Sequence, residues 1–136
     1  MVCVYCGSET GVVNSRRQKR NNQVWRRRRC ETCGAVFTSH EALDLSSALM
    51  VNSGGSTKPF LTDMLFTEVL LALQDHKDCY IAAREVTSTV IGQLLKPPAE
   101  PVIEAKQISQ TAAKVLKRLD RRAHLRYLAE HQSLQG

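Results

Sequence analysis

The chain has 136 residues, enough for one compact domain or for a small domain joined to a modest one. No apolar run approaches the roughly 18 residues of a membrane span, and the N-terminus lacks the basic and apolar regions of a signal peptide. These features argue against a membrane protein and favour the cytoplasm. In that compartment thiols stay reduced, and clustered cysteines are metal ligands more often than disulfides.

The net charge of +6 comes from the N-terminal part of the chain. Residues 1–40 hold eight Lys and Arg against two acidic residues, whereas residues 41–136 hold eleven of each sign. This asymmetry indicates an anionic partner for the N-terminal part alone. The same part has too few large apolar side chains to bury a core, so it needs a metal, disulfides or a partner to fold. We therefore divide the chain into a first domain of residues 1–42 and a second of residues 45–136.

Four cysteines of the first domain form two Cys-x-x-Cys pairs, with 23 residues between the pairs. Such pairs bring four thiolates together for tetrahedral Zn²⁺, and four sulfur ligands leave no open position for catalysis. A glycine follows each pair and tolerates the positive φ that a zinc knuckle requires. Disulfides and an iron–sulfur cluster are the alternatives. We predict one structural zinc per chain, with the ligands Cys3, Cys6, Cys30 and Cys33.

A basic segment without acidic residues lies between the two cysteine pairs. If Val24–Arg29 is a strand, its alternate arginines point to opposite faces. Packing them against protein alone would be costly, because the segment holds no acidic partner, whereas phosphate can accept bidentate guanidinium contacts. The alternative is a solvated basic face, and Trp25 could either stack on a base or shield a thin core. We predict contacts to double-stranded DNA from Arg16, Arg17, Lys19, Arg20, Arg26, Arg27, Arg28 and Arg29.

The second domain is predicted to be mostly helical, so the whole chain is expected to be α+β. A hairpin opens it, because Leu45–Asn52 and Thr57–Leu61 flank a Ser-Gly-Gly-Ser turn. Helical spacing of apolar residues then predicts four helices. They cover Leu65–Leu73 with Thr62 as N-cap, Ala83–Leu94 ended by Pro97-Pro98, Ile108–Leu119, and about Asp120–His131.

Other residues of the second domain carry weaker signals. No phosphate-binding loop, nucleophile elbow or pair of catalytic carboxylates occurs, so we expect no enzymatic activity. Cys79 is expected to be a buried structural thiol. His124 and His131 lie seven residues apart on one helical face and could line a pocket. A second basic cluster is more typical of a solvated face than of a DNA contact or subunit interface; it comprises Lys114, Lys117, Arg118, Arg121 and Arg122.

Several motifs of residues 1–41 occur together in a known order. They are the first Cys-x-x-Cys, Asn14-Ser15-Arg16, Arg26–Arg29 running into Cys30-x-x-Cys33-Gly34, and Phe37-Thr38-x-x-Glu41. This arrangement resembles the zinc ribbon of the NrdR family, bacterial repressors of ribonucleotide reductase genes. The remainder resembles the family's second domain, an ATP-cone, in its order of hairpin and helices. The resemblance implies a nucleoid-associated cytoplasmic repressor that binds paired promoter sites as a nucleotide-controlled homo-oligomer.

The second domain departs from the family where the nucleotide is expected. Asn52-Ser53 replaces a basic pair that meets the phosphates, Met64 replaces a lysine, and Lys58 replaces an acidic residue. Tyrosines that border the base are replaced by His124 and His131. A triphosphate carries about four negative charges, and a site with few cations holds it poorly. We expect a degenerate ATP-cone that keeps its fold and binds ATP or dATP weakly or not at all.

Two other functions remain open from the sequence. The chain could be an accessory protein whose ribbon binds nucleic acid, without reading its sequence, in a larger transcription complex. It could also be a nucleotide sensor whose pocket has moved. A single ribbon is a small footprint, so a repressor would need at least two ribbons on paired sites.

Overall fold

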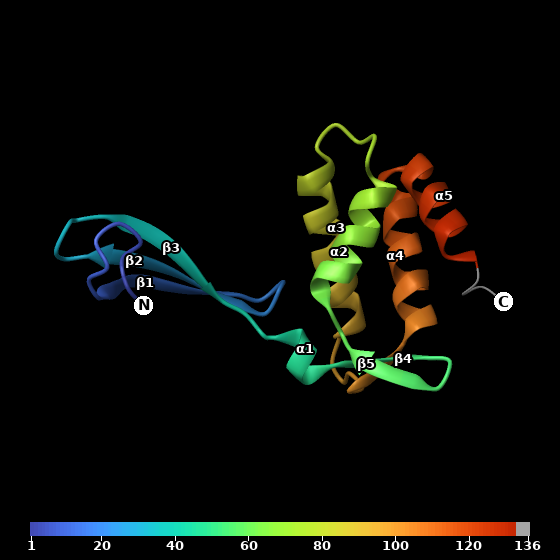
Figure 1. Ribbon diagram of the computed structural model, residues 1–136, viewed down its shortest axis with the longest axis horizontal. Coiled ribbons are helices and arrows are strands. Elements are labelled where there is room, and N and C mark those ends of the chain that lie inside the picture. Colours follow the sequence, from blue (N-terminus) through green and yellow to red (C-terminus); the bar gives the residue numbers. More distant parts are fainter. Residues whose placement is uncertain (133–136) are drawn as a thin grey trace. The chain divides into compact units, whose positions relative to one another are not determined.

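Strand-forming sequence comes first along the chain and mostly helix-forming sequence follows, with the boundary near residue 43. The computed structural model describes residues 1–132, and it separates a ribbon unit, residues 1–43, from a helical unit that begins at Asp44 (Figure 1). The α+β class predicted from the sequence is confirmed. Residues 133–136 of the predicted second domain lie outside the described part. Within that part, no helix combines the length and apolar character needed to cross a bilayer.

The ribbon unit is one antiparallel sheet with strand order β1-β2-β3. The strands are β1 (Thr10–Gln18), β2 (Gln23–Cys30) and β3 (Val36–Glu41). Asn22 has a φ of 50° in the turn between β1 and β2, a conformation that asparagine tolerates better than most residues. Cys3 and Cys30 are the two buried residues of this unit, as expected for a domain that cannot build an apolar core.

The helical unit contains the expected hairpin, formed by β4 (Met50–Ser53) and β5 (Ser56–Pro59). Gly54 and Gly55 occupy the turn with φ angles of 61° and 85°, which suit a two-residue hairpin turn. A third strand, β6 (Val102–Glu104), pairs in parallel with β4 and was not predicted. At three residues, it is too short to show an alternating pattern.

The predicted first hairpin strand, Leu45–Asn52, is wrong over its first half. Leu45–Ala48 forms a short helix, α1, and the strand begins only at Met50. Asp44 explains the difference, because its Oδ1 accepts hydrogen bonds from the Ser46 N–H and hydroxyl and caps the helical turn. The second strand, predicted as Thr57–Leu61, instead ends at Pro59.

Four helices stand side by side, with the hairpin across one end of them (Figure 1). They are α2 (Thr62–Ala72), α3 (Cys79–Leu94), α4 (Ala105–Leu119) and α5 (Arg121–Glu130). The predicted stripes face a common core except at Leu119, which is exposed at the end of α4, and each helix contributes a fully buried side chain. Examples are Val69 of α2, Val90 of α3, Leu116 of α4 and Tyr127 of α5.

The helix ends are partly as predicted. Asp120 caps α5, since its Oδ1 accepts the backbone N–H groups of Arg122 and Ala123. Thr62 is not the N-cap of α2, because the helix already begins at this residue and Leu61 occupies the cap position without a side-chain hydrogen bond. The buried Phe60 fixes this entry point through its N–H, which donates to the carbonyl of Leu49.

Candidate metal centre and nucleic-acid interface

Two equivalent knuckles hold the cysteines of the ribbon unit. The N–H of Gly7 donates to the carbonyl of Cys3 at 3.0 Å, and the N–H of Gly34 donates to that of Cys30 at 2.9 Å. The two glycines have φ angles of 75° and 74°. These values confirm that the glycine after each pair supplies a left-handed turn, which other residues adopt only at a cost.

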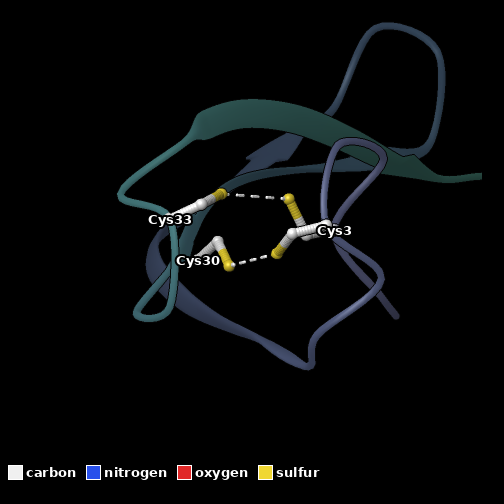
Figure 2. Close-up of side chains that lie close together, drawn as sticks. Cys3, Cys30 and Cys33 are labelled. Carbon is white, nitrogen blue, oxygen red and sulfur yellow. Dashed lines mark hydrogen bonds between the residues drawn. The ribbon is translucent and has the colours of Figure 1, made fainter.

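The four thiols converge on a single point. Sγ of Cys3 lies 3.6 Å from Sγ of Cys33, and Sγ of Cys6 lies 3.5 Å from Sγ of Cys30. All four sulfur atoms lie within 4.8 Å of one another, and Figure 2 shows the thiols of Cys3, Cys30 and Cys33 turned inward. Zinc–sulfur bonds of about 2.3 Å in a tetrahedron place sulfur atoms about 3.8 Å apart. The four cysteines are therefore positioned to hold one zinc ion.

The thiols also differ in how readily they lose a proton. The hydroxyl and the N–H of Ser8 lower the pKa of Cys6 to about 6, and the N–H groups of Tyr5 and Cys6 lower the pKa of Cys3. The N–H of Ala35 lowers the pKa of Cys33, but burial and the three neighbouring cysteines outweigh it and raise that pKa to about 12. The N-terminal knuckle thus favours thiolates, whereas deprotonation of all four cysteines requires a cation.

The pairing of the strands, which includes a β-bulge in β1, shows which face of the sheet each arginine occupies. Val12 pairs with Arg28 and Asn14 pairs with Arg27, so Val13 is an extra residue in β1. Beyond the bulge, Arg16 lies opposite Trp25 on β2. Because cross-strand partners share a face, the sheet has two distinct basic faces.

The first face, named here the open face, carries Arg16, Trp25, Arg27 and Arg29. All three arginines are exposed, and Trp25 is half-buried. The Arg16 guanidinium carbon lies 5.8 Å from the centre of the Trp25 ring, close enough for a cation–π contact. Arg27 donates a long hydrogen bond of 3.4 Å to the hydroxyl of Thr38. These guanidinium groups have no carboxylate partner among residues 1–132 and lie open to an anion.

The opposite face holds Arg26 and Arg28, both half-buried. Arg26 forms an ion pair of 3.0 Å with Glu41, and Nε of Arg28 donates to the Ser39 hydroxyl at 2.8 Å. The expectation that the arginines find no acidic partner is therefore wrong for Arg26, because β3 supplies one. The Glu41 of the Phe-Thr-x-x-Glu motif was the available signal, and only the register of β2 with β3 gives it this role.

The remaining basic residues of the segment lie outside these two groups. Arg17 is exposed near the end of β1, on the same face as Arg26, while Lys19 and Arg20 are exposed in the turn that leads to β2. The structure thus brings Arg16, Arg27 and Arg29 together and separates them from the other predicted contacts.

The helical unit contains a cavity of about 380 Å³ between the hairpin, α2 and α4. Ser53, Met64 and Lys58 line it, and Lys58 is the single Lys or Arg among its described lining residues. Asn52 is not among them; its side-chain amide donates to the carboxylate of Glu104 at 2.9 and 3.1 Å. The cavity is otherwise lined largely by apolar side chains from β4, β5, α2 and α4.

The two histidines of the last helix have different surroundings. His131 lines the cavity, stacks on Tyr127 at a centroid distance of 4.0 Å and lies 3.4 Å from the carboxylate of Glu68. His124 instead contacts the carbonyl of Ala113 through Nδ1 at 2.8 Å, and it does not line the cavity. The pocket expected beside both histidines therefore includes only His131. Cys79 is half-buried at the start of α3, rather than buried.

Comparison with known proteins supports the presence of a zinc ribbon at the N-terminus. The family model described as Transcriptional repressor NrdR-like, N-terminal domain matches residues 1–41. The Transcriptional repressor NrdR of Rhodospirillum centenum is 32% identical over 133 residues, which cover 97% of this chain and 86% of that protein. The protein of the same name from Thermus thermophilus is 32% identical, with 97% and 84% covered. The chain belongs to the NrdR family of transcriptional repressors.

The family relationship extends over both units. The NrdR protein of Methylibium petroleiphilum is 28% identical over 137 residues, which cover all of this chain and 92% of that relative. The N-terminal family model ends at Glu41, at the end of β3, so it spans both knuckles and all three strands of the ribbon. The four cysteines that are positioned to bind one zinc ion thus lie within the zinc ribbon that this family model describes.

Proposed function

We propose that the chain is a DNA-binding transcriptional repressor of ribonucleotide reductase or related genes, acting in the bacterial cytoplasm. In this proposal it binds paired promoter sites as a homo-oligomer held together by the helical unit. The names of its relatives and the zinc ribbon support a repressor that binds DNA. Paired sites are needed because one ribbon buries too little surface to select a promoter.

The open face carries this proposal. Arg16, Arg27 and Arg29 are exposed on one side of a sheet that the metal centre holds in place, without carboxylate partners in the described chain. Guanidinium groups presented in this way suit bidentate contact with phosphate oxygens or base edges. Arg26 and Arg28 already bond to Glu41 and Ser39, so we assign them mainly to the rigidity of the sheet.

The test compares two double variants on the same strand. Arg27→Gln with Arg29→Gln should reduce the slope of log affinity against log salt by about 1.8, since each lost phosphate contact removes about 0.9. Arg26→Gln with Arg28→Gln removes the same charge and should change the slope less, with zinc content equal in both variants. A larger slope change in the second variant would show that the wrong face has been assigned.

The accessory-protein alternative makes a different prediction for footprinting on upstream DNA. A repressor should protect half-sites that recur at multiples of the helical turn, and it should self-associate. Uniform protection with strong salt dependence and no discrete half-sites would support the accessory function instead.

For the helical unit we propose weak or absent binding of ATP and dATP. The cavity offers one lysine, Lys58, and it also contains the carboxylate of Glu68, which would repel phosphate. Asn52 is engaged by Glu104 and does not face the cavity. Calorimetry with each nucleotide tests this proposal, and micromolar affinity for either one would refute it.

A further inference from the structure

A second basic surface lies on the helical unit, along α4 and the first turn of α5. Residues 105–122 hold six Lys and Arg and one Asp, whereas the rest of residues 41–136 holds five Lys and Arg and ten acidic residues. All six basic side chains are exposed. They are Lys106, Lys114, Lys117, Arg118, Arg121 and Arg122, named here the basic ridge.

The positive charges of the ridge are not balanced by neighbouring carboxylates. None of its six side chains forms an ion pair among the described residues. Helix α4 carries no carboxylate, and Asp120, which follows it, directs its Oδ1 to the N–H groups of Arg122 and Ala123. An ordinary solvated helix face mixes both signs of charge, because pairs three or four residues apart stabilise the helix. This face has one sign only.

The position of two arginines is unfavourable for the free protein. Lys117 and Arg118 lie in the last turn of α4, where the helix dipole favours cations. Arg121 and Arg122 lie in the first turn of α5, where the dipole disfavours them, and no acidic residue occupies that turn. At the junction of α4 and α5, the neighbouring basic side chains repel one another, and the dipole of α5 adds a second repulsion on Arg121 and Arg122. A bound anion would relieve both.

The shape and composition of the ridge fit a nucleic-acid backbone. Lys106, Lys114 and Arg118 lie on one row of α4 at multiples of four residues, and the row is about 18 Å long at 1.5 Å per residue. One DNA strand presents a phosphate about every 3.4 Å along the axis while it winds around that axis, so a straight row of this length can reach a few of its phosphates. The ridge contains three lysines and no aromatic residue. Lysine is depleted in protein–protein interfaces, so this composition favours DNA over an acidic protein.

We propose that the basic ridge is a second DNA contact, which binds phosphates without reading sequence. The inference rests on the proposed function, since it assigns to the helical unit a share of the DNA binding proposed for the ribbon. The ridge supplies affinity, and the open face of the ribbon supplies the contacts that can distinguish bases.

The experiment measures affinity of the full zinc-loaded chain for a random-sequence duplex over a range of salt concentrations. The ridge variant carries Lys114→Gln, Lys117→Gln and Arg121→Gln. The control variant carries Lys77→Gln, Arg84→Gln and Lys96→Gln, which remove the same charge from exposed positions outside the ridge. Circular dichroism verifies that both variants keep the helical fold.

The ridge variant should lose about 2.7 from the magnitude of the log–log salt slope, and the control should keep the wild-type slope. Between about 50 and 200 mM salt, wild-type affinity should then fall about 40-fold more than that of the ridge variant. Equal slopes for wild type and ridge variant would overturn the proposal, as would equal losses in the ridge and control variants. Altered self-association in sedimentation velocity, with an unchanged slope, would identify a protein contact and overturn it too.

The ribbon variant, Arg27→Gln with Arg29→Gln, separates the two proposals. If it binds like wild type while the ridge variant has lost its slope, the assignment of the ribbon fails and the ridge stands. If it loses slope while the ridge variant does not, the ridge proposal fails alone.

Discussion

Zinc removal should unfold the ribbon unit and leave the helical unit intact. Within residues 1–43 only Cys3 and Cys30 are buried, so almost no apolar burial remains once the metal is gone. Structural zinc sites supply roughly 10–16 kcal/mol of apparent binding free energy at neutral pH. Whole domains have only about 5–15 kcal/mol of net stability, so this loss exceeds what the ribbon could retain. The helical unit has its own core from four helices and should not respond.

The chain allows both units to be followed in one sample. Trp25 is the single tryptophan and lies in the ribbon, whereas all helices of residues 1–132 lie in the helical unit. Titration with a strong chelator should shift the Trp25 emission to longer wavelength and leave the ellipticity at the helical band unchanged, and added zinc should reverse the shift. A parallel loss of helical signal, or an emission that does not change with the chelator, would show that the two units do not have separate stabilities.

Three further predictions concern the knuckle glycines, the core of the helical unit and the effect of pH on zinc binding. Gly7→Ala or Gly34→Ala should weaken zinc binding about 5–30-fold, because a left-handed alanine costs about 1–2 kcal/mol, whereas Gly11→Ala in β1 should have little effect; competition with a chromogenic chelator measures all three. Leu116→Ala should lower the unfolding free energy of the helical unit by about 2–5 kcal/mol in denaturant titrations, with unchanged zinc content as the sign of a separate ribbon. Because the zinc-free ribbon is unfolded, zinc binding must displace protons from thiols with an ordinary pKa of about 8.5, so affinity should rise about tenfold or more per pH unit between about pH 6 and 8; a flat profile would contradict this.

The two knuckles of the ribbon were the most predictable part of the molecule, because the residues that specify each knuckle are close together in the sequence. Two Cys-x-x-Cys pairs with a following glycine specify a knuckle almost independently of the rest of the chain, and Gly7 and Gly34 have the expected backbone. The hairpin turn at Gly54-Gly55 was predictable for the same reason. The helices were predictable because their apolar stripes are long enough to show the helical period.

Features that depend on distant pairing were not predictable in this way. Strand β6 exists because Val102–Glu104 meets β4 across half the domain, and three residues carry no pattern of their own. Helix α1 depends on a side-chain cap at Asp44 that competes with strand formation in a short apolar run. The partner of Arg26 is fixed by the register of β2 with β3, which no count of charges in the segment can supply.

The extra residue at Val13 makes one position of β1 tolerant of a change in length. Removal of Val13 would leave Val12 opposite Arg28 and Asn14 opposite Arg27, so the ladder would become continuous and Arg16 would stay opposite Trp25. Removal of Ser15 with the bulge kept would instead place Arg17 opposite Trp25 and exchange the faces of the side chains between the deletion and the turn. Engineered ribbons could therefore be shortened at Val13 with their recognition surface kept, whereas a deletion two residues further along the strand would alter that surface.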